Sequence, residues 1–240
     1  MNPLNRKARI AGLLFLLLVL TAPIRLVYVP ATLFVSDNAS ATVANIVANE
    51  TLFRTGIFAD LLAGILTLFL TLALYRLFAD VDRRLAVLVV ILGGIFPTAI
   101  YFFNVLNDAA VLLIARGPAF LSVFEKPQRD AAAMLFLRLH GQEIGAAMVF
   151  WGLWLLPLAV LILRSGFLPR ILGWLLILNG FAYLAQSVTW SLLPQVDDVV
   201  TRIATPLQFA EVLFMLWLLI MGARPGFRRR PDPRTITTGP

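Results

Sequence analysis

The chain has 240 residues, of which 60% are hydrophobic and only 14% are charged, and its mean hydropathy is +0.88. Soluble domains average about 45–50% apolar and about 25% charged residues, so lipid must be the solvent for much of this chain. There is no cysteine and one histidine, which excludes disulfides, thiolate metal sites and any metal or haem site that needs two histidines from one chain.

Six apolar stretches are long enough to cross a hydrocarbon core, which takes about 20 helical residues. They cover 10–29, 54–78, 85–107, 134–163, 168–193 and 205–222. We therefore predict an all-α, six-span transmembrane helix bundle over residues 1–222. Basic residues precede the first stretch, but no cleavage site follows it, so we expect a retained anchor.

The longest predicted connection, residues 30–53, contains a helix signal. Ser36-Asp37-Asn38 could cap a short helix that carries Val43, Ile46 and Val47 on one face. Such a helix would lie on the outer membrane surface, and an ordinary ordered loop is the alternative.

Two shorter connections, 79–84 and 164–170, are predicted to be tight turns. Pro169 suits the first turn of the fifth helix, where its missing N–H costs nothing.

The basic residues predict the orientation. With the N-terminus in the cytoplasm, that side holds thirteen Lys and Arg: Arg6, Lys7, Arg9, Arg76, Arg83, Arg84, Arg164, Arg170, Arg224, Arg228, Arg229, Arg230 and Arg234. The other side holds seven: Arg25, Arg54, Arg116, Lys126, Arg129, Arg138 and Arg202. The positive-inside rule therefore places both termini in the cytoplasm. Residues 223–240 are basic and Pro-rich, which predicts a disordered cytoplasmic tail.

The same distribution explains the net charge of +7, because the basic residues flank apolar stretches and fill the tail. We therefore expect the lipid bilayer as partner and no nucleic acid. No cofactor is expected.

Polar residues gather in the outer half of the predicted bundle, and every helix contributes to them. The candidate site residues are Arg54, Asp60, Asn104, Asp108, Arg138, His140, Glu143 and Glu211. His140 and Glu143 are spaced i,i+3, and Asn104 and Asp108 are spaced i,i+4, so each pair shares a helix face.

Two interpretations of this set stay open. In the structural one, the residues tie helices together, and Arg25, Arg54 and Asp108 lie closest to water at helix ends. In the functional one, they line a water-accessible cavity open to the outer face.

His140 beside Glu143 is chemically suited to handling protons, because imidazole titrates near neutrality. A metal site built from His140 and Glu143, with Asp60 or Glu211 as a third ligand, is weaker because this spacing is common by chance, and no metal is predicted. No residue is assigned a catalytic role.

Several segments carry a family resemblance. They are Ala11-Gly12-Leu13-Leu14, Ala44-Asn45-Ile46, Leu52-Phe53-Arg54-Thr55-Gly56-Ile57-Phe58-Ala59-Asp60-Leu61, Leu139-His140-Gly141, Glu143-Ile144-Gly145 and Ser165-Gly166-Phe167-Leu168-Pro169-Arg170-Ile171-Leu172-Gly173. With these segments the chain resembles the DUF4386 family of bacterial integral membrane proteins of unknown function. The resemblance implies a six-helix protein of the bacterial inner membrane and supplies no activity, cofactor or catalytic residue.

The leading functional hypothesis is a multi-pass protein whose outer polar cluster binds or transports a small polar solute, a lipid headgroup or protons. One alternative is a membrane-embedded enzyme that uses His140 and Glu143 as acid–base groups on a lipid-like substrate. Another is a scaffold or accessory subunit in which the cluster is purely structural.

Overall fold

The computed structural model describes residues 2–224, so most of the tail predicted over 223–240 lies outside the described residues. The elements are α1 (Pro3–Pro23), η1 (Ile24–Tyr28), α2 (Val29–Leu33), α3 (Ala39–Ala48), α4 (Glu50–Phe78), α5 (Arg83–Val90), η2 (Ile91–Ile95), α6 (Phe96–Arg116), η3 (Ala119–Leu121), α7 (Lys126–Ser165), α8 (Arg170–Leu192), η4 (Pro194–Val196), α9 (Asp197–Leu216) and η5 (Trp217–Met221).

Joined end to end, these elements form six long apolar helices that could each span a membrane, within the described part of the chain. They run over Pro3–Leu33, Glu50–Phe78, Arg83–Arg116, Lys126–Ser165, Arg170–Leu192 and Pro194–Met221, and the short α3 is the seventh helix. The predicted all-α fold with six spans is confirmed. The chain is a multi-pass membrane protein.

Several of the predicted spans were too short: the first runs over Pro3–Leu33 rather than 10–29, and the sixth begins at Pro194 rather than at 205. The third span continues to Arg116 rather than ending at 107, and the fourth begins at Lys126 rather than at 134. At about 1.5 Å per residue, the 40 residues of α7 measure about 60 Å, roughly twice the thickness of a hydrocarbon core. One end of the bundle is therefore built from helix that continues past the strongly apolar stretches.

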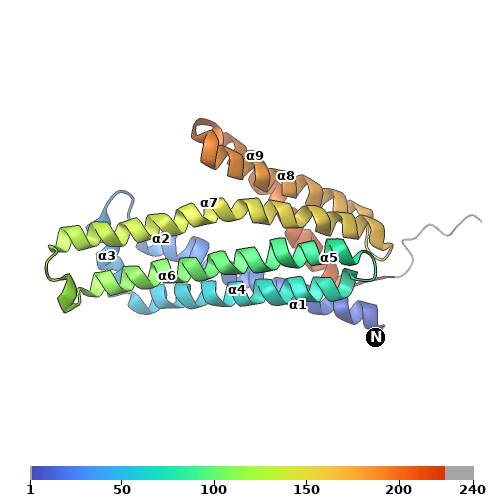
Figure 1. Cartoon of the computed structure of the whole chain (residues 1–240), viewed down its shortest axis with the longest axis horizontal. Helices are drawn as coiled ribbons and strands as arrows, with labels where there is room; N and C mark the ends of the chain where they lie inside the picture. The colour runs from blue at the N-terminus through green and yellow to red at the C-terminus, as the bar shows by residue number, and fades with distance from the viewer. Residues whose placement is uncertain (1, 225–240) are drawn as a thin grey trace, which may run out of the picture.

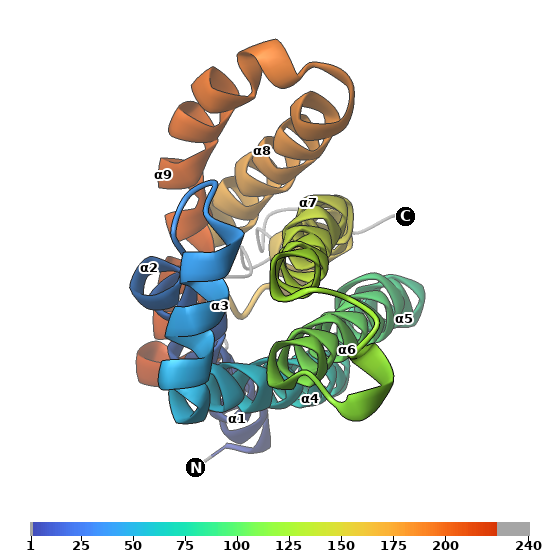
Figure 2. The same cartoon turned by 90° about the vertical axis from the view of Figure 1, so that its left-hand side faces the viewer.

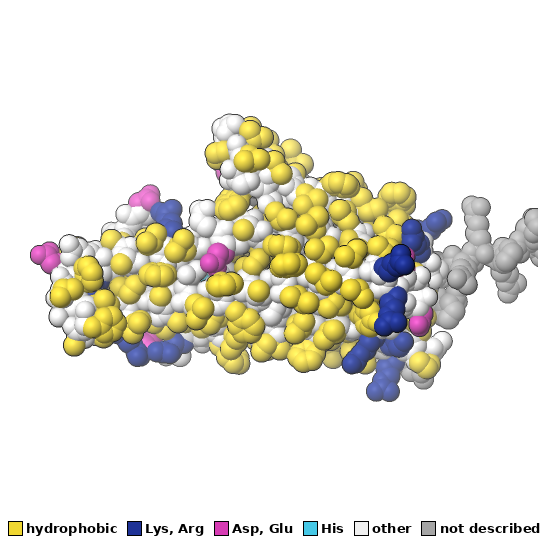
Figure 3. Space-filling view, viewed as in Figure 1, with side chains coloured by type: hydrophobic (Ala, Val, Ile, Leu, Met, Phe, Trp, Pro, Cys, Tyr) yellow, Lys and Arg dark blue, Asp and Glu magenta, His cyan; other side chains and the backbone are white. Residues whose placement is uncertain are grey.

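The helices form an elongated bundle. Long helices α1, α4, α6 and α7 run along its length, while α8 and α9 form a hairpin on α7 that leans away from the others (Figure 1). Seen from the end, the helices surround a common centre (Figure 2). Hydrophobic side chains cover the flank, and Lys and Arg gather at the end where the N-terminus lies (Figure 3).

Segments η1 and η2 are π-helical turns, and prolines explain both. Pro30 cannot donate to the carbonyl of Leu26, inside η1, and Pro97 cannot donate to that of Gly93, inside η2. A missing helical hydrogen bond of this kind favours a local widening of the helix. The widened turn η1 carries Arg25, which is buried.

The short helix α3 forms as its sequence predicts, with the Asn38 side chain accepting a hydrogen bond from the Ala41 N–H at 2.9 Å. The apolar face of α3 packs into the bundle: Val43 and Ile46 are buried, while Val47 is half exposed. Val43 and Ile46 pack with Val29, Leu33, Phe53, Val111, Leu112, Ala133 and Leu137. Helix α3 therefore closes the bundle end opposite the termini.

The two tight turns lie where they were predicted. Asp82 caps α5, and Gly166 ends α7 in the left-handed conformation at φ +67°. Pro169 is the N-cap of α8 rather than a residue of its first turn, because the chain is still extended there. Residues 165–173 of the family resemblance thus contain the turn that connects α7 to α8.

Two hydrophobic cores follow each other along the bundle. The larger one lies toward the termini and includes Phe78, Leu158 and Phe214. The smaller one lies beneath α3 and includes Ile46 and Phe53. Each of the first four spans places one buried ionisable residue between the two cores: Arg25, Asp60, Asp108 and His140.

Candidate functional site

Arg25 and Asp108 form an ion pair in the interior of the bundle. The guanidinium Nε donates to Asp108 Oδ2 and Nη2 donates to Oδ1, both at 2.6 Å. The two side chains are 2% and 0% exposed. Two parallel charge-assisted bonds hold the carboxylate in a fixed orientation. Asp108 is therefore fully engaged by Arg25.

His140 lies against this pair. Its Nδ1 is 3.2 Å from Arg25 Nη2 and 3.3 Å from Asp108 Oδ1. Arginine can only donate hydrogen bonds, so a hydrogen bond between Arg25 and Nδ1 requires a lone pair on Nδ1. A hydrogen bond from Nδ1 to Asp108 would instead require a proton on Nδ1, so the tautomer of His140 decides which of the two contacts is a hydrogen bond.

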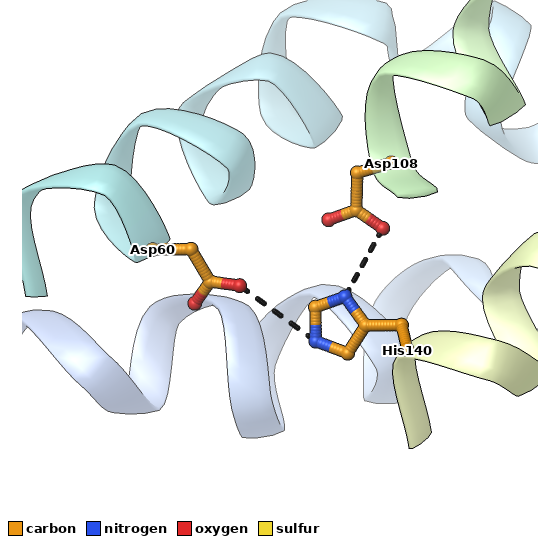
Figure 4. Close-up of side chains that lie close together, drawn as sticks. All are labelled: Asp60, Asp108 and His140. Atoms are coloured by element: carbon orange, nitrogen blue, oxygen red, sulfur yellow. Dashed lines mark ion pairs between the residues drawn. The ribbon is translucent and has the colours of Figure 1, made fainter. Parts of the chain in front are cut away.

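Asp60 approaches the other side of the imidazole, with Oδ2 at 3.7 Å from His140 Nε2 (Figure 4). This gap is longer than a hydrogen bond. Asp60 has no solvent exposure, and neither of its carboxylate oxygens has a hydrogen-bond partner among residues 2–224. We call Arg25, Asp60, Asp108 and His140 the buried cluster.

Small and aromatic residues shape the space for Arg25. A Cβ at Gly56 would lie 3.0 Å from Arg25 Cδ, so glycine there lets the arginine pass between α1 and α4. The guanidinium also lies 5.6 Å and 5.7 Å from the ring centroids of Phe34 and Phe53. These distances suit cation–π attraction. Gly56 and Asp60, both within residues 52–61 of the family resemblance, thus contribute to the buried cluster from one face of α4.

The expectation that Arg25 and Asp108 reach water was wrong. Both are buried, because the first span continues eight residues beyond Arg25 to Leu33 and the third continues eight beyond Asp108 to Arg116. The expectation holds for Arg54, whose side chain is 51% exposed and pairs with Glu50 at 2.6 Å.

The remaining candidate residues lie apart from the buried cluster. Arg138 is exposed and pairs with Asp37 at 3.0 Å, and Glu143 accepts a hydrogen bond from Asn107 at 3.1 Å. Glu211 accepts one from Asn179 at 2.9 Å. The proposed pairing of His140 with Glu143 is replaced by contacts of His140 with Asp60 and Asp108.

Asn104 is buried one turn along α6 from Asp108, on the side toward the termini. Its Oδ1 has no hydrogen-bond partner among the described residues. Together with Tyr101 it borders a small gap between α6 and α7. Asn104 therefore separates the buried cluster from the space beyond.

That space is a cavity of about 440 Å³ in the middle of the bundle. Residues from α1, α4, α6, α7, α8 and α9 line it, among them Tyr101, Trp151, Trp154, Tyr183, Gln208 and Glu211. Glu211 thus belongs to the cavity. No feature of the sequence separates it from the residues of the buried cluster.

Among the residues that the structure describes, one group has the spacing of a metal site: ligand atoms of Asp60, Asp108 and His140 lie within 4.8 Å of one another. Arg25, however, occupies both oxygens of Asp108 and faces Nδ1 of His140. A metal ion bound there would meet a buried positive charge, so the donor set does not fit one well. A proton suits the same atoms better.

A family model described as a domain of unknown function, DUF4386, matches residues 10–222. Neither the curated proteins nor the solved structures include a significant match to the chain. The family match includes the first long helix from residue 10, the other five in full, and the four residues of the buried cluster. The chain therefore belongs to the DUF4386 family.

Proposed function

We propose that this membrane protein binds one proton on Asp60, within the buried cluster, and that this proton site serves a binding or transport function. The observation that carries the proposal is the environment of Asp60: no solvent exposure, no hydrogen-bond partner among the described residues, and an imidazole nitrogen 3.7 Å away.

Charge counting supports a bound proton. Arg25 contributes one positive charge and Asp108 one negative charge, so that pair is neutral. With a neutral His140, an ionised Asp60 would leave one uncompensated negative charge in the interior. Burying such a charge is expensive, and groups in that position commonly take up a proton. A single proton on Asp60 makes the whole buried cluster neutral.

The position of His140 gives the proton site a second state. With its own proton on Nε2, the imidazole can donate to Asp60 once that carboxyl ionises. A contact of 3.7 Å would then shorten to a hydrogen bond, drawing α4 and α7 together at this point. Proton release would thereby change the packing of two helices, which is what a proton-linked binding or transport protein requires.

A structural role for part of the cluster is supported by its own observation. The two bonds between Arg25 and Asp108 link the first span to the third, and no ligand is needed to explain them. We assign this pair to holding helices together and to fixing His140. The proton site proper is Asp60.

The proposal includes a placement in the cell: a bacterial inner membrane with both termini in the cytoplasm. It is supported by the Lys and Arg side chains that gather at the N-terminal end of the bundle (Figure 3). Arg76, Arg83, Arg164 and Arg170 lie at helix ends beside the two tight turns. The buried cluster then lies toward the outer face. This orientation would let protons enter from outside, past the α3 end of the bundle.

Nitrogen NMR of the imidazole tests the neutral His140 on which the proposal depends, because His140 is the chain's sole histidine and its signals need no assignment. The protein is purified with a histidine-free tag, labelled with ¹⁵N-histidine and placed in nanodiscs. We expect a neutral ring with the proton on Nε2 at pH 7. A doubly protonated imidazolium at pH 7 would contradict the proposal, because the proton would then be on His140.

A further inference from the structure

The central cavity combines an apolar, aromatic lining with one carboxylate. Trp151, Trp154, Tyr101 and Tyr183 contribute rings, and Glu211 contributes the only acidic side chain of the lining, which includes no Lys or Arg. At about 440 Å³ the cavity falls within the range of small-molecule sites, about 300–1,000 Å³. It is separate from the buried cluster, whose four residues do not line it.

Glu211 is held in place from a neighbouring helix. Asn179 of α8 donates to its Oε1 at 2.9 Å. Two further contacts stiffen the same wall: Gln208 donates to Gln186 at 2.9 Å, and the rings of Trp151 and Tyr183 meet edge to face at 5.8 Å. The carboxylate therefore has a fixed position beside aromatic faces.

We propose that this cavity binds a hydrophobic organic cation. A carboxylate in the middle of a membrane helix is costly while it lacks a counter-charge, and a cationic ligand supplies one. The faces of Trp and Tyr rings attract the same kind of charge. An apolar lining with aromatic faces and one carboxylate thus matches an organic cation better than an anion or a neutral molecule.

Access to the cavity follows from the arrangement of α8 and α9. This hairpin leans away from the other helices toward the end opposite the N-terminus (Figure 1). Val27, which borders the cavity from the first span, is 64% exposed in the structure. A hydrophobic cation dissolved in the membrane therefore has a lateral route between the first span and the hairpin.

Tetraphenylphosphonium and tetraphenylborate are matched probes, because they share shape and size and differ in the sign of their charge. Binding of each labelled ion to the full-length protein in zwitterionic nanodiscs is measured by equilibrium dialysis, with empty nanodiscs subtracted. We expect the native protein to bind the cation at least about tenfold more tightly than the anion. Equal affinities in the native protein would overturn the proposal without the need for any variant.

Glu211→Gln and Glu143→Gln form a matched pair of variants. Both glutamates are half-buried and accept one amide hydrogen bond from a neighbouring helix, but only Glu211 lines the cavity. Glu211→Gln should weaken cation binding about ten- to hundredfold, as expected for loss of a charged partner, and Glu143→Gln should leave it unchanged. Equal effects of the two variants would show that the membrane protein's overall charge, and not the cavity, attracts the cation.

Ala22→Phe supplies a steric test, because Ala22 borders the cavity and a phenyl ring there would fill part of it. It should abolish binding of the cation while Glu143→Gln retains it. Undiminished binding in Ala22→Phe would place the ion elsewhere on the protein and refute the site. None of these outcomes depends on the protonation of Asp60, so this proposal and the proposed function can fail independently.

Discussion

Arg25 and Asp108 are 83 residues apart in the sequence and are joined by two parallel hydrogen bonds of 2.6 Å inside the bundle. The pair fixes the first span against the third. It also presents Arg25 Nη2 to His140, whose ring then faces Asp60. One ion pair therefore organises the surroundings of the proposed proton site.

Removing one partner of this pair should be strongly destabilising. Arg25→Met leaves the Asp108 carboxylate buried without its counter-charge, and we expect a loss of about 3–5 kcal/mol in the free energy of unfolding. Arg54→Met is the control, because its pair with Glu50 is exposed and its loss should therefore cost much less. Unfolding by SDS titration in mixed micelles measures both variants, and similar losses would refute the burial argument.

Replacement by asparagine should destabilise the protein much more at Asp108 than at Asp60, although both aspartates are buried. Asp108→Asn removes the charge that receives both bonds of Arg25 and should cost about 3 kcal/mol or more. Asp60→Asn resembles the protonated carboxyl and should change stability by no more than about 1 kcal/mol. Both side chains are 0% exposed, so burial alone predicts equal losses. A large loss in Asp60→Asn would mean that Asp60 is ionised in the native protein.

The passage for Arg25 between α1 and α4 depends on Gly56. Gly56→Leu should displace the arginine or part the helices, at a cost of about 1–3 kcal/mol. Gly141→Leu is the matched helical control, since a Cβ at Gly141 meets nothing within 4 Å. The same SDS titration compares them, and a Gly56→Leu variant as stable as Gly141→Leu would show that the close approach is unnecessary.

The orientation can be tested because the chain has no cysteine. Ser36 and Asp80 are exposed in connections at opposite ends of the bundle, before α3 and after α4. In intact cells, an impermeant maleimide should label Ser36→Cys and spare Asp80→Cys until the cells are lysed. The reverse labelling pattern would contradict cytoplasmic termini.

Hydropathy was sufficient to predict the six spans, since crossing a hydrocarbon core demands long apolar helices. It could not predict where the helices end, because helices continue beyond the apolar stretch when protein neighbours cover them. Residues 108–116 of α6 and residues 126–133 of α7 continue the helices in this way, beneath and beside α3. The underestimated lengths placed Arg25 and Asp108 near water, whereas both are buried.

The side-chain contacts within the site could not be predicted from the sequence for a related reason. Spacing shows which residues share a helix face, but not which neighbouring helix that face meets. His140 and Glu143 share a face of α7 and yet contact different partners, Asp60 and Asp108 for one and Asn107 for the other. Glu211 was grouped with them because of its depth, but α9 places it at the central cavity.

Infrared spectroscopy of the carboxyl groups tests the central claim most directly, because a protonated carboxyl has a C=O band that a carboxylate lacks. At pH 7 we expect such a band in the native protein, a weaker band in Asp60→Asn, and an undiminished band in Asp130→Asn. Asp130 is the control because it is also buried but is paired with Lys126 at 2.7 Å. A native spectrum without the band, or a band that is undiminished in Asp60→Asn, would contradict a proton on Asp60.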